Sequence, residues 1–234
     1  GLVREVAQEA RCPLAAVEVA LGLAEEGDDG RSVMALNRIE QELAVLDALI
    51  TQLLSVARLE AADESSENIS VDLNELLGSI CRDASFEGSE EQKQVEFTAT
   101  GQATINADRS LLKSAFENIV RNALRHSPAG SKITVTNEYL SDAREIRITV
   151  LDAGSGVPTE MLEDLFKPFV RVESARDRDS GGFGVGLAIA SAAIRRYKGA
   201  IKARNHESGG LEVTVTLPVN ETHLSRVWTY HRPR

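Results

Sequence analysis

Aromatic side chains are scarce in this chain of 234 residues, where Phe, Trp and Tyr together make up only 4%. A hydrophobic core must therefore be built mainly from Leu, Ile, Val and Ala, and a hydrophobic content of 42% is enough to build one. The two cysteines, Cys12 and Cys81, are too few for a disulfide framework and lack a metal-ligand spacing. These shortages favour one or two ordinary globular domains.

Positive charge is also in deficit, because 26 Lys and Arg face 36 Asp and Glu, for a net charge of −10. Binding to nucleic acid depends on basic residues that neutralise phosphates, so we expect no nucleic-acid partner. No apolar run reaches the roughly 20 residues that span a bilayer, and no signal peptide is evident. The chain begins inside a helical pattern without a cap, which indicates a fragment whose upstream part is absent.

Two helical patterns fill residues 1–62. Apolar residues recur in steps of three and four within residues 2–26 and again within residues 36–57, with a Gly-Asp-Asp-Gly turn at residues 27–30 between them. The second stripe keeps a heptad-like spacing. This favours an antiparallel hairpin that pairs with a second copy into a four-helix bundle, a homodimer through residues 1–62. The alternative is a hairpin that packs on the domain that follows.

A second domain is expected after a polar, acidic linker at residues 63–69, and it extends over residues 70–219 before a tail at residues 220–234. Helical signals cover residues 73–88, 109–127 and 188–197, with Asp108 as the N-cap of the second. Strand signals cover residues 95–97, 104–106, 133–135, 146–150, 201–203 and 211–217. The order predicts an α+β fold with helices layered on one face of a mixed sheet.

Four short motifs in this domain carry residues suited to chemistry. In the first, Asn118 and Asn122 lie one turn apart on a helix, next to Glu117, and their oxygens suit a hard cation such as Mg²⁺. Arg125 would then lie near phosphates. In the second, Asp152 follows a strand, so that its carboxylate could accept a hydrogen bond from an exocyclic amine.

The remaining motifs are a Phe pair around a proline, at residues 165–169, and a glycine-rich loop that opens a helix at residues 181–188. Backbone amides and a helix N-terminus in such a loop favour a polyphosphate, although the Lys of a P-loop is missing. Each motif alone is more often structural: solvated Asn residues, a simple turn, a core Phe pair or a misleading glycine loop. Their occurrence together and in this order is far more specific.

The ordered set resembles the N, G1, F and G2 boxes of the catalytic ATP-binding domain of sensor histidine kinases, over residues 70–218. The hairpin before it resembles the dimerisation and phosphotransfer domain of that family, and residues 165–186 are most similar to the Cpx-type envelope-stress sensors. The resemblance implies an α/β sandwich of the histidine kinase, gyrase and chaperone type. It also implies ATP and Mg²⁺ as ligands and a response regulator receiver domain as partner.

The resemblance further implies a role for each matched residue. Asn122 would hold Mg²⁺ with Asn118 and Glu117 beside it, and Asp152 would read the adenine amine. The other implied nucleotide-binding residues are Arg125, Gly154, Gly156, Phe166, Phe169, Arg176, Arg178, Gly182, Gly184, Gly186 and Leu187. The full-length protein would place this soluble portion on the cytoplasmic side of the bacterial inner membrane, with membrane contact only through the absent upstream segment.

The phosphotransfer helix departs from the family pattern. Gln8 occupies the phosphoacceptor position, and its amide nitrogen is a poor nucleophile because its lone pair is delocalised. Glu9 remains as a general base, while Cys12 replaces the hydroxyl or amide that positions water for dephosphorylation of the partner. Two interpretations follow: a kinase core that has lost its acceptor, or a nucleotide-binding pseudokinase that acts as a dimeric regulatory module. A gyrase- or chaperone-type ATPase is disfavoured by the hairpin.

Overall fold

The computed structural model describes residues 68–168, 170 and 184–219, together with the isolated positions 17, 35, 36 and 39. The hairpin expected over residues 1–62, most of the predicted lid and the tail at residues 220–234 therefore lie outside the described residues. Within the part of the chain that is described, no helix is both long and apolar enough to cross a membrane.

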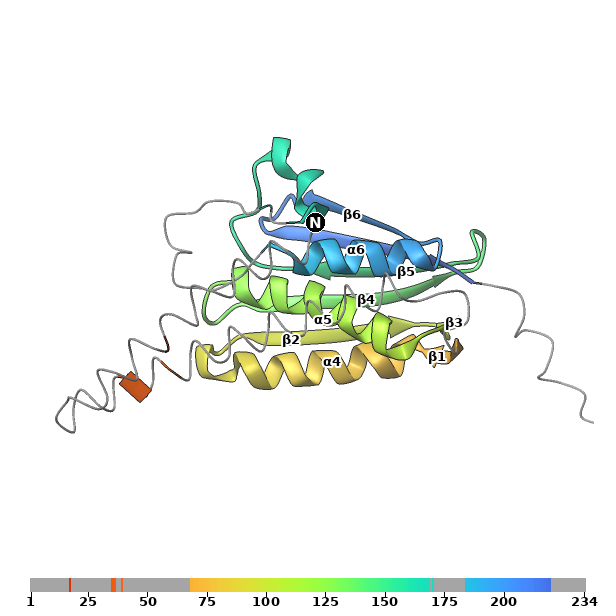
Figure 1. Cartoon of the computed structure of the whole chain (residues 1–234), viewed down its shortest axis with the longest axis horizontal. Helices are drawn as coiled ribbons and strands as arrows, with labels where there is room; N and C mark the ends of the chain where they lie inside the picture. Colours follow the sequence, from red (N-terminus) through yellow and green to blue (C-terminus); the bar gives the residue numbers. More distant parts are fainter. Residues whose placement is uncertain are drawn as a thin grey trace, which may run out of the picture.

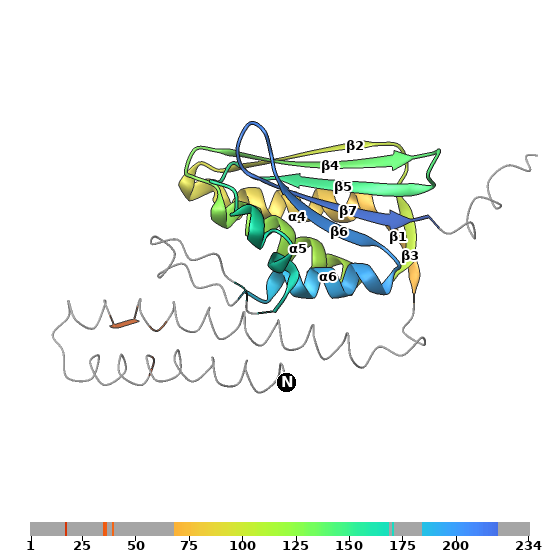
Figure 2. The same ribbon diagram turned by 90° about the horizontal axis from the view of Figure 1, so that it is seen from above.

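A five-stranded mixed sheet forms one layer of the domain. Its strand order is β2 (Gln94–Thr100), β4 (Lys132–Leu140), β5 (Glu145–Leu151), β7 (Leu211–Pro218) and β6 (Ala200–Asn205). The pairing of β2 with β4 is parallel and the other pairings are antiparallel. Helices α4 (Leu73–Glu87), α5 (Arg109–His126) and α6 (Gly186–Arg196) cover one face (Figures 1 and 2), which confirms the predicted arrangement.

The core lies between these two layers and is almost entirely aliphatic. Strand residues alternate between core and surface, so that Ile133 and Val135 of β4 are fully buried while Lys132 at the start of the strand is exposed. Phe116 of α5 is the only aromatic side chain in the buried core of the described residues. The low aromatic content of the sequence is thus matched by a core of Leu, Ile, Val and Ala.

Helix α5 begins where the sequence predicts. The side chain of Asp108 accepts hydrogen bonds from the backbone amides of Ser110 and Leu111 at 2.8 and 3.2 Å, which satisfies two donors of the first turn. Asp72 caps α4 in the same way, through Asn74 and Glu75. Fixing the start of α5 also fixes the face on which Asn118 and Asn122 lie.

A small second sheet was not predicted from the sequence. Strand β1 (Ile69–Asp72) pairs antiparallel with β3 (Thr104–Ala107), and it begins at the last residue assigned to the linker. Only Val71 of its four residues is buried, and four residues are too few to show an alternating pattern. Three short 3₁₀ helices, η1 (Gly88–Glu91), η2 (Thr159–Met161) and η3 (Asp164–Phe166), complete the described elements.

Both connections of the domain to the rest of the chain lie at one end of the sheet. Pro218 of β7 pairs with Glu145, and Val219 donates a hydrogen bond to the carbonyl of Arg144 in the β4–β5 turn. The start of α4 reaches the same end, where Asn74 bonds Gly101 and Asn137. The loop after β5 lies at the opposite end (Figures 1 and 2).

Candidate functional site

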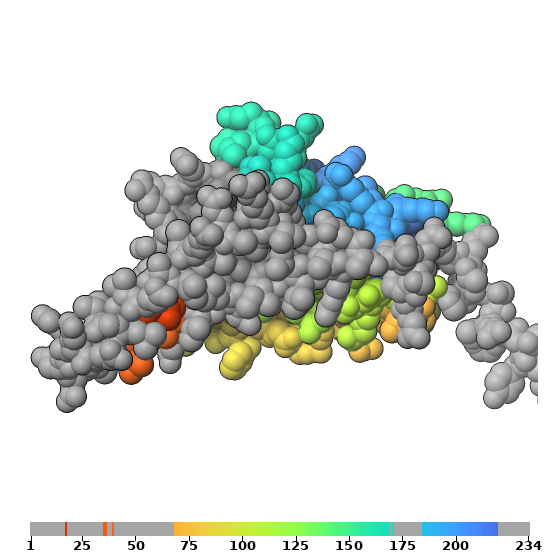
Figure 3. All heavy atoms as spheres, in the orientation of Figure 1, coloured from red at the N-terminus to blue at the C-terminus, as the bar shows by residue number. Residues whose placement is uncertain are grey.

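Three of the four motifs meet at the end of the sheet that is remote from both chain connections. The second motif follows β5, the first lies on α5, and the fourth opens α6, which packs against α5. The third motif is in the segment of η2 and η3, which projects from the surface next to α6 (Figure 3). The structure therefore brings together motif residues that are distant in sequence, such as Asn118 and Gly186, which are 68 positions apart.

Asp152 is held rigidly at the end of β5 and is only 6% exposed. Its Oδ1 atom accepts hydrogen bonds from the backbone amides of Leu211 and Gly154 at 2.8 and 2.9 Å. No other described residue bonds Oδ2, so one carboxylate oxygen is fixed and the other is available. Burial raises the pKa of Asp152, and the two backbone hydrogen bonds and the charge of His126 only partly oppose this.

The glycines around Asp152 permit very close backbone packing. A Cβ atom at Gly154 would lie 2.7 Å from the carbonyl oxygen of His126 at the end of α5. Gly156 has a φ of +72°, and Gly210, with a φ of +88°, lies so close to the Asp152 carbonyl that a Cβ would overlap it. The loop thus has its glycines where side chains do not fit.

Ser127 joins the loop to α5. Its hydroxyl donates to the carbonyl oxygen of Ala123 at 2.7 Å and accepts from the backbone amide of Ala153 at 3.2 Å. Ser127 itself is 4% exposed, and its partner Ala123 is buried while Ala153 lies at the surface. No sequence pattern marks this role, because Ser is a common residue in turns of every kind.

Asn118 brings the first and fourth motifs into contact. Its Nδ2 donates to the carbonyl of Ser114 at 2.9 Å, and its Oδ1 would be 2.8 Å from a Cβ atom at Gly186. Gly186 begins α6, and no described side chain caps that N-terminus. Gly184, with a φ of +68°, precedes it and Leu187 is buried. The uncapped amides of this helix start suit a phosphate group.

The residues predicted to hold Mg²⁺ lie along one side of α5. Asn122 is half-buried, and its carboxamide makes no hydrogen bond to any other described residue. Glu117 forms an ion pair with Lys113 at 3.6 Å. The described residues contain no cluster of three His, Cys, Asp or Glu side chains that could hold a metal. One available carboxamide fits a Mg²⁺ ion whose other ligands are water and phosphate oxygens.

The other predicted residues divide into two groups. Phe166 ends η3 and packs at the edge of the core, and Arg125 is exposed on the last turn of α5. Outside the described residues lie Gln8, Glu9, Cys12, Phe169, Arg176, Arg178 and Gly182. Sequence reasoning missed Ser127 and Asn205, whose side chains bond the loop after β5.

Taken together, the described site offers a buried carboxylate with one available oxygen, a glycine-rich surface beside it, an uncapped helix start and a carboxamide side chain. A flat heterocycle with an exocyclic amine fits the first pair of features, and a polyphosphate with a hard cation fits the second. These groups occur together in a nucleotide.

Comparison with known proteins identifies a matching family and several relatives. The family model "Histidine kinase-, DNA gyrase B-, and HSP90-like ATPase" matches residues 107–221. The sensor histidine kinase CpxA of Escherichia coli strain K12 is 37% identical over 220 residues, which cover 93% of this chain and 46% of CpxA. The chain thus spans about half the length of the curated relatives that it matches.

Solved structures share the fold. Histidine kinase ThkA, in a structure of its complex with response regulator protein TrrA, aligns with a TM-score of 0.72 and 22% identity, over 94% of this chain and 61% of that chain. Full-length ShkA in complex with AMPPNP aligns with a TM-score of 0.67 and 24% identity, over 92% of this chain and 45% of that chain.

Proposed function

We propose that this chain is the kinase core of a two-component sensor. The premise is that it belongs to the histidine kinase-, DNA gyrase B- and HSP90-like ATPases and resembles the Cpx-type sensor histidine kinases among them. The core binds ATP with Mg²⁺ through residues 70–219. Its dimerisation and phosphotransfer helices are residues 1–62, and its partner is the receiver domain of a response regulator.

The observation that carries this proposal is the arrangement around Asp152. Two backbone amides hold its Oδ1, which leaves Oδ2 to accept a hydrogen bond from the exocyclic amine of adenine. The glycines at 154 and 156 allow the ring to approach the backbone. ShkA, which shares this fold, was solved with AMPPNP, an adenine nucleotide analogue.

Residues of α5 and α6 would receive the phosphates. The start of α6 at Gly186 offers backbone amides, and the Asn122 carboxamide would ligate Mg²⁺, with Asn118 and Glu117 next to it. Bound ATP supplies the γ-phosphoryl group. The lid residues Arg176 and Arg178 remain predicted contacts to that group.

Gln8 limits what this core can do with the nucleotide. Transfer to a histidine would form a phosphorus–nitrogen bond as the β–γ bridging bond of ATP breaks, and the Gln8 amide cannot replace an imidazole in that step. We therefore expect ATP binding without autophosphorylation. Gln8 is the one residue that favours the second candidate function. In that function the chain is a nucleotide-binding pseudokinase that modulates a partner kinase or regulator.

Radiolabelling with γ-labelled ATP and Mg²⁺ tests the proposal. The wild-type chain should bind ATP and acquire no acid-labile label, and Gln8→His should acquire it, because the substitution restores the acceptor nitrogen. Gln8→Ala is the matched control and should remain unlabelled. Strong labelling of the wild-type chain would show that Gln8 is not the acceptor position.

One further result would separate the candidate functions, and another tests the assigned metal site. ATP binding by Gln8→His without any label would favour the pseudokinase, since the defect would then extend beyond one residue. Loss of Mg²⁺-dependent ATP affinity in Asn122→Ala is expected from the assigned metal site. Unchanged affinity in that variant would refute the assignment.

A further inference from the structure

Asn205 makes a pair of hydrogen bonds to the loop that contains Asp152. It is the last residue of β6, and its Oδ1 accepts from the backbone amide of Val157 at 2.9 Å. Its Nδ2 donates to the carbonyl oxygen of the same Val157 at 2.7 Å. A carboxamide that bonds both backbone groups of one residue imitates the pairing that a neighbouring strand would supply.

The loop needs such a support at this point. Its beginning is fixed, because Asp152 pairs with Leu211 and Ala153 bonds Ser127. Beyond Gly154 the loop has left β5 and no strand accompanies it. Glycines at 154 and 156 leave this stretch with more conformational freedom than other residues would allow. The Asn205 side chain restrains the far end of it.

Gly156 is shaped to admit the Asn205 carboxamide. A Cβ atom at position 156 would lie 2.6 Å from Oδ1 of Asn205, well inside contact distance. The backbone of Gly156 also has a φ of +72°, where side chains are strained. The glycine of the second motif and the amide of Asn205 are therefore fitted to each other across 49 residues of sequence.

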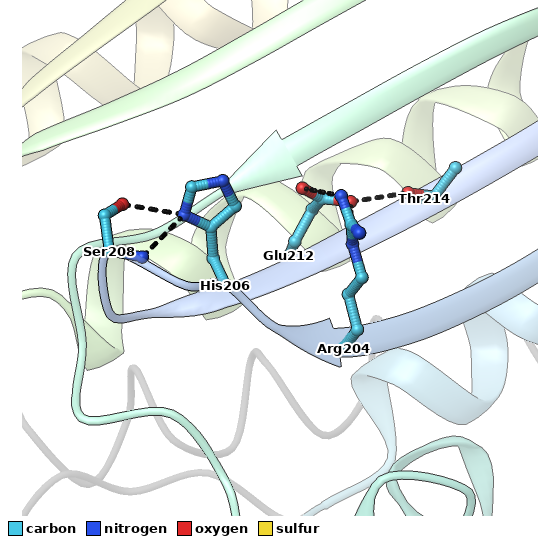
Figure 4. Close-up of polar contacts among 5 residues, drawn as sticks. All are labelled: Arg204, His206, Ser208, Glu212 and Thr214. Carbon is cyan, nitrogen blue, oxygen red and sulfur yellow. Dashed lines mark hydrogen bonds and ion pairs between the residues drawn. The ribbon is translucent and has the colours of Figure 1, made fainter.

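The hairpin that carries Asn205 is braced on both sides of it. Arg204 donates from Nε and Nη2 to the two carboxylate oxygens of Glu212 at 2.7 and 2.9 Å, across β6 and β7 (Figure 4). In the turn, Nδ1 of His206 lies 2.7 Å from Oγ of Ser208. The His206 amide also bonds the carbonyl of Gly210 at 3.0 Å. These hydrogen bonds on both sides of Asn205 restrain the backbone that carries it.

We propose that Asn205 is a positioning residue that sets the loop of residues 153–158 against Asp152 and thereby tunes the preference of the site for adenine. The inference rests on the proposed function, since it assumes that Asp152 reads a base. It assigns to the β6–β7 hairpin a part in base selection, while the phosphates are held separately by α5 and α6.

The separation of the two regions predicts an unequal effect of mutation. Without the Asn205 amide, the loop gains freedom at the wall of the base pocket, whereas the start of α6 and the Asn122 side chain are unchanged. Binding of ATP should weaken more than binding of GTP, because GTP does not gain from a correctly shaped adenine pocket. General destabilisation of the domain would weaken both nucleotides alike.

Dissociation constants for ATP and GTP, measured with the full chain below its unfolding temperature, provide the test. For Asn205→Ala we expect ATP affinity to fall about tenfold, the order of effect of two lost hydrogen bonds, with a change in GTP affinity below about twofold. Asn106→Ala is the matched control. Asn106 lies on β3, away from the loop, and with its Nδ2 directed at the carbonyls of Asn68 and Ile69 it also bonds backbone groups.

A second variant keeps one of the two bonds. Asn205→Asp retains an acceptor for the Val157 amide but places a carboxylate oxygen against the Val157 carbonyl, so its ratio of ATP to GTP affinity should lie between those of wild type and Asn205→Ala. An unchanged ratio in both variants would overturn the role of Asn205. Failure of the wild-type chain to bind ATP would instead overturn the proposed function, and the inference with it.

Discussion

At the scale of single residues, Asp152 combines two opposed demands. Its burial at the end of β5 makes the negative charge costly, which is why its pKa is raised, yet an ionised or neutral acceptor is what an adenine amine requires. The backbone amides of Leu211 and Gly154 reduce this cost by bonding Oδ1. In the role that we propose for Asp152, this remaining cost to the folded state accompanies a buried acceptor for the adenine amine.

Asp152→Asn should separate binding from stability. The new Nδ2 would face the adenine amine as a second donor, so ATP affinity should fall at least about a hundredfold. Wherever Asp152 is ionised in wild type, the variant should be at least as stable, because it removes a buried charge and keeps an acceptor for Leu211 and Gly154. Calorimetric titration with ATP and thermal unfolding measure the two effects.

The pH dependence of that comparison has a definite sign. Because the folded-state pKa of Asp152 is raised, wild type carries the burial penalty above that pKa and loses it as the carboxyl group protonates. Any stability advantage of Asp152→Asn should therefore be complete only above the raised pKa and disappear as pH falls through it. An advantage that grows toward acid pH would contradict this account.

Ser127→Ala should destabilise the domain by about 1–2 kcal/mol, because the buried Ser127 hydroxyl is lost together with its hydrogen bonds to the buried Ala123 carbonyl and the Ala153 amide. Urea denaturation measures the change. The control is Ser89→Ala, which removes an exposed hydroxyl that donates to the carbonyl of Phe86, and it should change stability by less than about 0.5 kcal/mol. Equal effects of the two substitutions would show that Ser127 is not a structural link.

Prediction from the sequence reached some of these residues and not others. Asp152 and its two glycines were identifiable because their spacing is a motif, and Asn118 and Asn122 because they share a helical face. Ser127 and Asn205 act through contacts with residues 26 and 48 positions away. No local pattern marks a polar residue whose partner is set only by the tertiary fold.

At the scale of elements, the β6–β7 hairpin depends on the pair of Arg204 and Glu212. Glu212 is 8% exposed, and the hydrogen bonds from Arg204 lower its pKa. A lowered pKa means that the pair stabilises the folded state above the unfolded pKa of Glu, about 4.3, and that this stabilisation is lost as pH falls through the folded pKa. The Arg204 side chain is largely exposed, so solvent weakens the interaction.

Glu212→Gln should accordingly lower the melting temperature at pH 7 by only about 2–4 °C. The difference from wild type should shrink as the solution is acidified below about pH 4. Glu138→Gln, on the exposed face of β4 in the same sheet, is the control and should have little effect at either pH. A difference that is independent of pH would indicate a packing effect instead of an ion pair.

Element prediction succeeded where periodicity or a cap was long enough to read. The predicted helix at residues 109–127 ends one residue beyond α5, and its N-cap Asp108 is confirmed. Each predicted strand lies within an observed one, but β4 extends from Lys132 to Leu140, well beyond residues 133–135. Strand β1 was missed because its pairing with β3, and not its own composition, defines it.

At the scale of the whole molecule, the core cluster of the described residues extends from Val71 to Leu217 and so lies within the second domain. The division of the chain at residues 63–69 and 219 remains a prediction. A fragment of residues 68–219 should unfold in one cooperative transition and bind ATP within about twofold of the full chain, because every described contact of the site is internal to it. Calorimetry on the fragment and the full chain measures both.

A much weaker ATP affinity of the fragment, with its cooperative transition intact, would contradict this division. It would mean that the helices of residues 1–62 contribute to the nucleotide site directly. The full chain with Asp152→Asn provides the baseline for absent binding, so that a partial loss can be recognised.

The position of the two chain connections also has a mechanical consequence. The chain enters the domain through β1, in the small sheet near the end that holds the β4–β5 turn, and it leaves the five-stranded sheet through β7 at that same end. A pull applied through both connections would therefore load the hydrogen bonds of β7 one after another from Pro218 inward. Strands opened in this way resist less than strands sheared along their length. Tension would reach Leu211 and Asp152 last, so the nucleotide end of the domain is mechanically the most sheltered part of the sheet.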